Sequence, residues 1–232
     1  MIGRWHYSIK FVYLIVKMKM ILGLTILFSL SSCFEIIEEL DLKKDHSGDF
    51  TYTLNMSASR LELNTILKLD SFKGRAIPSA KDISADMDKA ILLIRQSSGI
   101  NKAVYTKNWE DYIFEFKISF DSLAALDRAL NQTYQKLSKS KEPLKDRLLM
   151  ANGLLKRTSR LNRLSWFKKL NSKEVQDLSK ANYTCVYRFQ EKIKSQSNTH
   201  ANTSKNGMAS LLKSDIKSLL KQQKSVANTI KF

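Results

Sequence analysis

Thiols are the scarcest reactive groups in this 232-residue chain, which contains only two cysteines, Cys33 and Cys185. A catalytic thiol needs a neighbouring base, usually a histidine, that removes its proton. Cys185 lies in a stretch whose odd positions are apolar, from Tyr183 to Phe189. This alternation predicts a cysteine packed in a strand rather than a nucleophile, and no basic partner can be assigned to it.

Carboxylates and histidines give no stronger indication of catalysis or metal binding. Adjacent acids such as Glu38 and Glu39 are expected on a solvated face, because acid–base catalysis needs a cleft that spacing alone cannot show. His46 and His200 are too few and too far apart for a histidine-rich metal site. The sequence also lacks a phosphate-binding glycine loop and zinc-type cysteine spacing. We therefore expect no enzyme, no metal and no cofactor.

The N-terminus has the order of a secretory signal. Lys17 and Lys19 precede the apolar run 21–30, and small residues follow it. This run reaches about half of the roughly 20 residues that span a bilayer as a helix. A signal anchor, the alternative, must recruit residues 9–16 and place both lysines near the bilayer centre, at about 2.5–3.5 kcal/mol each. If the signal is the short segment that follows residue 17, residues 1–17 are dispensable for export.

Leu30, Ser31, Ser32 and Cys33 resemble the lipobox of bacterial lipoproteins, in which an apolar residue and two small residues precede a cysteine. The resemblance implies cleavage between Ser32 and Cys33 and a diacylglycerol on the Cys33 sulfur. It also implies acylation of the new amine, for example by palmitate. The competing interpretation is a buried free cysteine in an N-terminal helix.

The lipoprotein resemblance also implies a location and a division of the chain. Residues 1–32 would be the signal peptide, and residues 33–232 the mature body. We expect this body in the cell envelope, held at the periplasmic face of the outer membrane by the lipid on Cys33. Cys185 then has no partner for an internal disulfide.

Two hairpins are predicted in the first half of the body. Apolar residues alternate over 34–42 and 50–56, which is typical of half-buried strands. The polar turn between them ends at Gly48, which can take a positive φ. A second pair of strands is expected at 100–106 and 112–120.

Helices are expected between and after these hairpins. A short one is predicted near 59–69, and a longer one begins after Ser79 and ends before Gly99. Another helix should start at Asp121, acting as its N-cap. Residues 143–164 suggest a basic helix, weakened at Gly153, and a final helix would carry Met208, Leu212, Ile216 and Leu219 before a last strand at Ile230 and Phe232.

We therefore predict one α+β domain, with a mainly antiparallel sheet and amphipathic helices packed on it. A lipidated cysteine that runs directly into a hairpin, followed by alternating helices and strands, resembles uncharacterised lipoproteins of the Bacteroidota. It is also similar to mycobacterial lipoproteins whose α+β domain is thought to engage envelope lipids.

The formal charge of +17 is concentrated in the second half of the chain. Residues 136–232 contain 22 basic and 6 acidic residues, which indicates a surface for an anionic partner. The predicted contact residues are Lys156, Arg157, Arg160, Arg163, Trp166, Lys168 and Lys169.

Basic and aromatic residues together can bind nucleic acid, but export argues against that partner. In the envelope the same residues would meet anionic lipid headgroups; a merely solvated basic segment is the competing interpretation. Two functions remain open, a non-enzymatic binding module at the membrane surface and a structural or accessory lipoprotein that binds another envelope protein.

Overall fold

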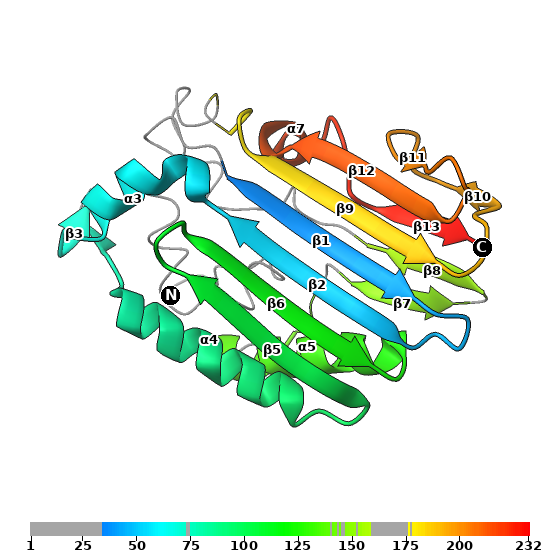
Figure 1. Ribbon diagram of the computed structural model, residues 1–232, viewed down its shortest axis with the longest axis horizontal. Helices are drawn as coiled ribbons and strands as arrows, with labels where there is room; N and C mark the ends of the chain where they lie inside the picture. The colour runs from blue at the N-terminus through cyan, green and yellow to red at the C-terminus, as the bar shows by residue number, and fades with distance from the viewer. Residues whose placement is uncertain are drawn as a thin grey trace, which may run out of the picture.

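A computed structural model describes residues 34–72, 75–139, 141–142, 144, 147–151, 153–158, 176 and 178–232. The predicted signal peptide and Cys33 lie outside this range. The described strands form a large sheet, a smaller sheet behind it and a short ribbon (Figure 1). Helices and strands are both present, as the prediction of an α+β fold requires.

The large sheet has seven strands and is mostly antiparallel. In spatial order they are β11 (Asn202–Thr203), β12 (Ala209–Asp215), β9 (Asn182–Phe189), β1 (Glu35–Leu42), β2 (Gly48–Asn55), β6 (Ile113–Phe120) and β5 (Ile100–Asn108). Both predicted hairpins, β1–β2 and β5–β6, are confirmed by antiparallel pairing. The pairing of β1 with β9 is parallel, in a sheet that is mainly antiparallel, as predicted.

The smaller sheet lies behind the large one in Figure 1. Its four strands, in order, are β10 (Ser195–Gln196), β13 (Asn228–Lys231), β8 (Leu154–Arg157) and β7 (Leu148–Ala151). The predicted basic helix over 143–164 is therefore wrong for the residues described there. Residues 152 and 153 join two antiparallel strands, and Gly153 has a φ of +72°. An Asn-Gly pair between two strand-forming runs is a strong hairpin signal in a sequence, because glycine takes a positive φ without strain.

The helices follow the predicted positions with some shifts. They are η1 (Ser57–Ser59), α3 (Arg60–Ile66), α4 (Ala80–Arg95), α5 (Leu123–Ser138) and α7 (Ile216–Leu220). Ser79 caps α4 through a capping box with Asp82. Ser122, rather than the predicted Asp121, caps α5, because its hydroxyl accepts from the Ala125 amide at 3.2 Å.

The predicted helix through Met208 and Leu219 is also wrong over most of its length. Ser210, Leu212 and Ser214 are buried in β12, and this period of two is that of a strand. Only the last turn is helical, where Asp215 accepts from the Ser218 amide at 2.7 Å and starts α7. The predicted last strand is present as β13.

The hydrophobic core lies between the two sheets and under α4 and α5. The even-numbered residues of β1, β2 and β6 point into it, and so do the apolar faces of both helices. The β1–β2 turn shows why Gly48 is a glycine. Its Cβ would lie 2.1 Å from the Asp41 carbonyl oxygen, whereas the positive φ in this turn belongs to His46. Gly48 thus permits close backbone approach, not the positive φ predicted for it.

The remaining elements form a projection at one end of the large sheet. We call residues 57–77 the α3 arm; its described residues, 57–72 and 75–77, contain η1, α3 and the ribbon of β3 (Ser71–Phe72) and β4 (Arg75–Ala76). Figure 1 shows it extending past the end at which β1 begins and β2 ends.

Candidate functional site

The predicted lipidation site adjoins the first residue of the described fold. Ser32 and Cys33 lie outside the described residues. Phe34, the next residue, has a 6% exposed side chain, and its carbonyl accepts from the Asn182 amide at 2.9 Å. Glu35 then pairs with both Asn55 and Asn182 at the end of the sheet. The residue next to the predicted attachment point therefore belongs to the described core.

The predicted anionic-surface residues divide into three groups. Arg160, Arg163, Trp166, Lys168 and Lys169 lie outside the described residues. Lys156 is exposed on β8, as a surface contact requires. Arg157 is not available for such a contact, because its side chain is 4% exposed and points into the core.

Arg157 forms a buried ion pair with Glu38, the acid in the middle of β1. Arg157 Nε and Nη2 donate to the two Glu38 carboxylate oxygens, each at 2.9 Å. Glu38 is 1% exposed, so the expectation that it lies on a solvated face is wrong. Glu39 points to the other face of the sheet, where it accepts from Arg188 at 2.8 Å.

Two tyrosines of β9 complete the coordination of Glu38. Glu38 on β1 lies opposite Cys185 on β9. Tyr183 and Tyr187, two residues before and two residues after Cys185, therefore lie on either side of Glu38. The Tyr183 hydroxyl donates to Glu38 Oε2 at 2.6 Å, and the Tyr187 hydroxyl donates to Oε1. A carboxylate has about four lone-pair sites, and here four donors point at them. We call Glu38, Arg157, Tyr183 and Tyr187 the Glu38 cluster.

The cluster fixes the protonation states of its members. Burial alone would raise the pKa of Glu38, but the Arg157 charge and the hydrogen bonds outweigh it, so the pKa lies below its ordinary value of 4.5. Burial raises the pKa of Tyr183 and of Tyr187 well above 10.0, and the Glu38 charge adds to this. The cluster is therefore a carboxylate and a guanidinium held by two neutral phenols.

A second set of polar residues, Asp127, Arg147 and Thr158, connects this cluster to α5. Arg147 Nε donates to Asp127 Oδ1 at 2.8 Å, and the Arg147 amide donates to Thr158 Oγ1 at 2.9 Å. The Thr158 carbonyl in turn accepts from the Arg157 guanidinium. A chain of polar contacts thus runs from α5, through the smaller sheet, to the centre of the large sheet. It connects α5 and the smaller sheet to the large sheet.

A small cavity lies between the two ion pairs. Its volume is about 10 Å³, and it is lined by Glu38, Phe50, Leu126, Asp127, Leu130, Leu144, Arg147, Leu148 and Arg157. Drug-sized ligands occupy pockets of about 300–1,000 Å³, and a cavity of the present size is at the limit for one water. Because its carboxylates are already paired, we assign the Glu38 cluster to the cohesion of the fold rather than to ligand binding.

The remaining features to examine are Cys185, groups of metal-ligating side chains and membrane-spanning helices. Cys185 is buried in β9, which confirms the packed strand cysteine, and burial raises the pKa of its thiol. Among the residues with described positions, no three or more His, Cys, Asp or Glu side chains are grouped for metal binding. Within the same part of the chain, no helix is both long and apolar enough to cross a bilayer.

Comparisons with known proteins add one structural likeness. No protein-family model matches the chain, and no curated protein matches it significantly. Among solved structures, the chain is similar to the folded domain of LppM from Mycobacterium tuberculosis, determined by NMR. That match has a TM-score of 0.39 and 12% sequence identity, and it covers 85% of this chain and 86% of that chain.

Proposed function

We propose that this chain is a lipid-anchored protein of the bacterial envelope, attached through a diacylglycerol on Cys33, whose body works as a non-enzymatic module at the membrane surface. The observation that carries this proposal is that a buried residue directly follows the lipobox. The signal-like segment with its lipobox ends at Cys33, and Phe34, the next residue, is buried and hydrogen-bonded to Asn182.

This arrangement supports processing at Cys33 in two ways. Removal of residues 1–32 would leave every described strand intact, because β1 starts at Glu35. The lipid would also be joined to the sheet without a spacer, so the body would stay against the bilayer. Two acyl chains suffice for stable attachment, at about 0.8 kcal/mol per buried CH₂ group.

The ligand class that we propose for the module is anionic lipid. Lys156 is exposed, and the sequence from 159 to 173 adds further basic residues without any acid among them. Arg157 is excluded from this surface by its pairing with Glu38. Each basic residue near an anionic surface contributes about 1 kcal/mol, so a few suffice for measurable binding.

The test of the anchor is the mass of the mature N-terminus. We expect intact-protein mass spectrometry to show residues 1–32 missing and acyl mass on Cys33. Cys33→Ser should abolish acylation and processing, whereas Cys185→Ala, the matched control at the other cysteine, should leave both unchanged. An unlipidated Cys33 with residues 1–32 retained in the membrane fraction would instead support a signal anchor.

A further inference from the structure

The α3 arm carries exposed leucines at the end of the body where the chain meets Cys33. Leu61 on α3 is 75% exposed and Leu69, just after it, is 42% exposed. Leu92 on α4 and Leu211 on β12 are the other large apolar residues with exposed side chains in the described part of the chain. Single exposed leucines are common on soluble proteins, so position, not exposure, gives these two their significance.

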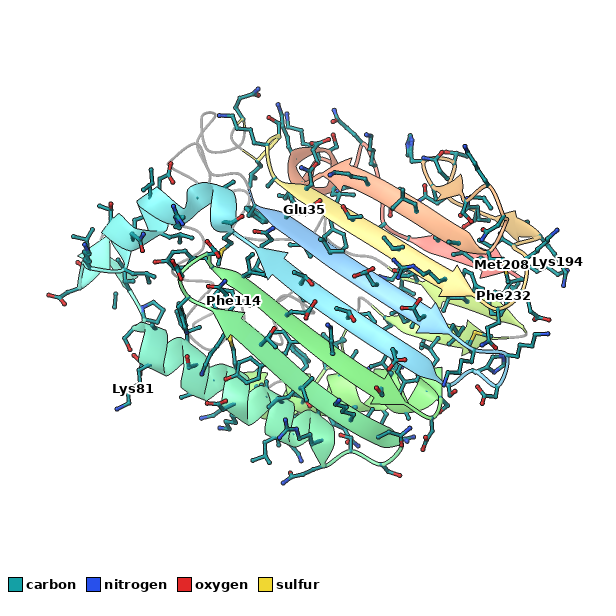
Figure 2. All side chains as sticks on the ribbon, viewed as in Figure 1. Glu35, Lys81, Phe114, Lys194, Met208 and Phe232 are labelled. Carbon is teal, nitrogen blue, oxygen red and sulfur yellow. The ribbon has the colours of Figure 1, made fainter. Side chains whose placement is uncertain are left out.

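The arm and the anchor are held at the same end of the sheet by covalent and hydrogen-bond geometry. Two peptide bonds separate Cys33 from Glu35, so their Cα atoms lie within about 8 Å of each other. Glu35 pairs with Asn55, and the arm begins two residues later at Ser57. In Figure 2, Glu35 lies at this end, while Met208 and Phe232 lie towards the opposite end.

The arm is fixed to the body rather than loosely attached. Leu63 and Ile66, on the inner face of α3, belong to the hydrophobic core. The Tyr112 hydroxyl donates to Asn64 Oδ1 at 2.6 Å, and Arg60 donates to Asp111 at 3.4 Å. The direction in which the arm projects is therefore set by the fold, and its outer leucines face away from the core.

From these placements we propose that the α3 arm is a second membrane contact, with Leu61 and Leu69 inserting into the bilayer beside the lipid on Cys33. This inference rests on the proposed anchor. The lipid brings the arm to the bilayer surface and keeps it there, so that even a weak contact is highly occupied. Two attachment points, unlike one, would also fix how the sheet is tilted relative to the membrane.

The charge of the arm indicates which kind of bilayer contact this is. The sequence of the arm, 57–77, contains four basic and two acidic residues, a net charge of +2, and Arg60 is paired with Asp111. Coulomb attraction can therefore add to the contact on an anionic bilayer, but a zwitterionic bilayer has no net charge to attract it, so there the leucines must supply the contact. Insertion should occur in zwitterionic vesicles and should depend little on salt, unlike binding through the basic segment.

The cysteine content makes the test direct. In the lipidated protein the Cys33 sulfur is a thioether, and Cys185 is buried with a raised thiol pKa, so an introduced surface cysteine is the reactive thiol. The mature lipidated protein carrying Leu61→Cys would be labelled with an environment-sensitive fluorophore and reconstituted into phosphatidylcholine vesicles. The matched control is Leu92→Cys, an exposed leucine 52% accessible in the last turn of α4.

We expect the label at position 61 to show a blue-shifted emission and quenching by nitroxide lipids, and the label at position 92 to show neither. Lipid mass on Cys33 with equally hydrated labels would overturn the arm contact alone. Absence of lipid mass would overturn the anchor and the arm contact together. A blue shift seen only in anionic vesicles at low salt would replace apolar insertion with charge attraction and so would also overturn the proposal.

Discussion

Glu38 and Arg157 lie 119 positions apart in the sequence and form a bidentate ion pair inside the core, with both N···O distances at 2.9 Å. The pair joins the central strand of the large sheet to β8 of the smaller sheet. Arg157 balances the charge of Glu38, and two tyrosines donate to the remaining lone pairs of the carboxylate. The energy of such a pair is therefore best examined by removing one partner and then both.

Arg157→Met should destabilise the protein by about 3–5 kcal/mol, because it leaves the Glu38 carboxylate buried without its cation. The double variant Glu38→Leu with Arg157→Met should recover much of this loss. Arg188→Met, the control on the outer face, should cost less than about 1 kcal/mol because that pair is solvent-exposed. Urea unfolding of the four proteins measures these differences, and equal losses for Arg157→Met and Arg188→Met would contradict the assignment.

Tyr187→Phe removes one of the four donors to the buried carboxylate. Hydrogen bonds to charged groups contribute about 1.5–3 kcal/mol, so we expect a loss in that range. The control is Tyr105→Phe, whose hydroxyl donates to the exposed Asp88 carboxylate and whose removal should cost less than about 1 kcal/mol. Thermal or chemical unfolding distinguishes the two, and an unaffected Tyr187→Phe protein would show that this donor is dispensable.

Acid should weaken the protein partly through Glu38. Its pKa in the folded state is lowered below 4.5, so ionised Glu38 adds stability that is fully present above its unfolded pKa. That stability is lost as the pH falls through the folded pKa. The unfolding free energy should consequently fall more steeply with acid in the wild type than in the Glu38→Leu, Arg157→Met variant. Parallel pH profiles would exclude a contribution from Glu38.

Two glycines should respond differently to alanine. Gly48→Ala places a Cβ 2.1 Å from the Asp41 carbonyl oxygen, which forces the hairpin backbone apart. Gly153→Ala meets no atom within 4 Å but must hold a φ of +72°, which costs about 1–2 kcal/mol. Equilibrium unfolding should show the larger loss for Gly48→Ala, and the reverse order would contradict the backbone contact.

The basic segment should give salt-sensitive binding to anionic vesicles. Glutamine at Arg160, Arg163, Lys168 and Lys169 should weaken the binding of a body that starts at Phe34 and should flatten its salt dependence, since screening acts on those charges. Glutamine at the exposed lysines 192, 194, 205 and 231 removes the same charge elsewhere and serves as the control. Vesicle co-sedimentation at two salt concentrations measures both, and equal effects would indicate a general charge response.

Local patterns predicted most of the secondary structure in the first half of the body. The alternation in 34–42 and 112–120 requires one buried face per strand, and the capping box at Ser79 specifies where α4 begins. The errors lie where a local pattern was ambiguous. Leu212, Ile216 and Leu219 fit a helical period. Ser210 and Ser214, however, are buried together with Leu212 on one face of strand β12, and only Ile216 and Leu219 lie in a helix.

The buried cluster could not be predicted as a unit, because its members come from β1, β8 and β9. One signal was nevertheless present. Glu38 is the acid on an otherwise apolar strand face, between Ile36 and Leu40, and a buried carboxylate requires a cation or several donors. The sequence could indicate the need for a partner, but only the tertiary fold shows that the partner is Arg157.

The parallel pairing of β1 with β9 has a consequence for the order in which the chain can fold. Tyr187 follows Glu38 by 149 positions, so at ribosomal speeds β9 emerges on the order of ten seconds after β1. During that interval β1 can pair with β2, β6 and β5 can join them, and the other edge of β1 stays open. Unpaired strand edges are templates for aggregation. Nascent chains that end before residue 182 should thus need chaperone protection, because β9, in the last quarter of the sequence, covers the open edge of the strand that was made first.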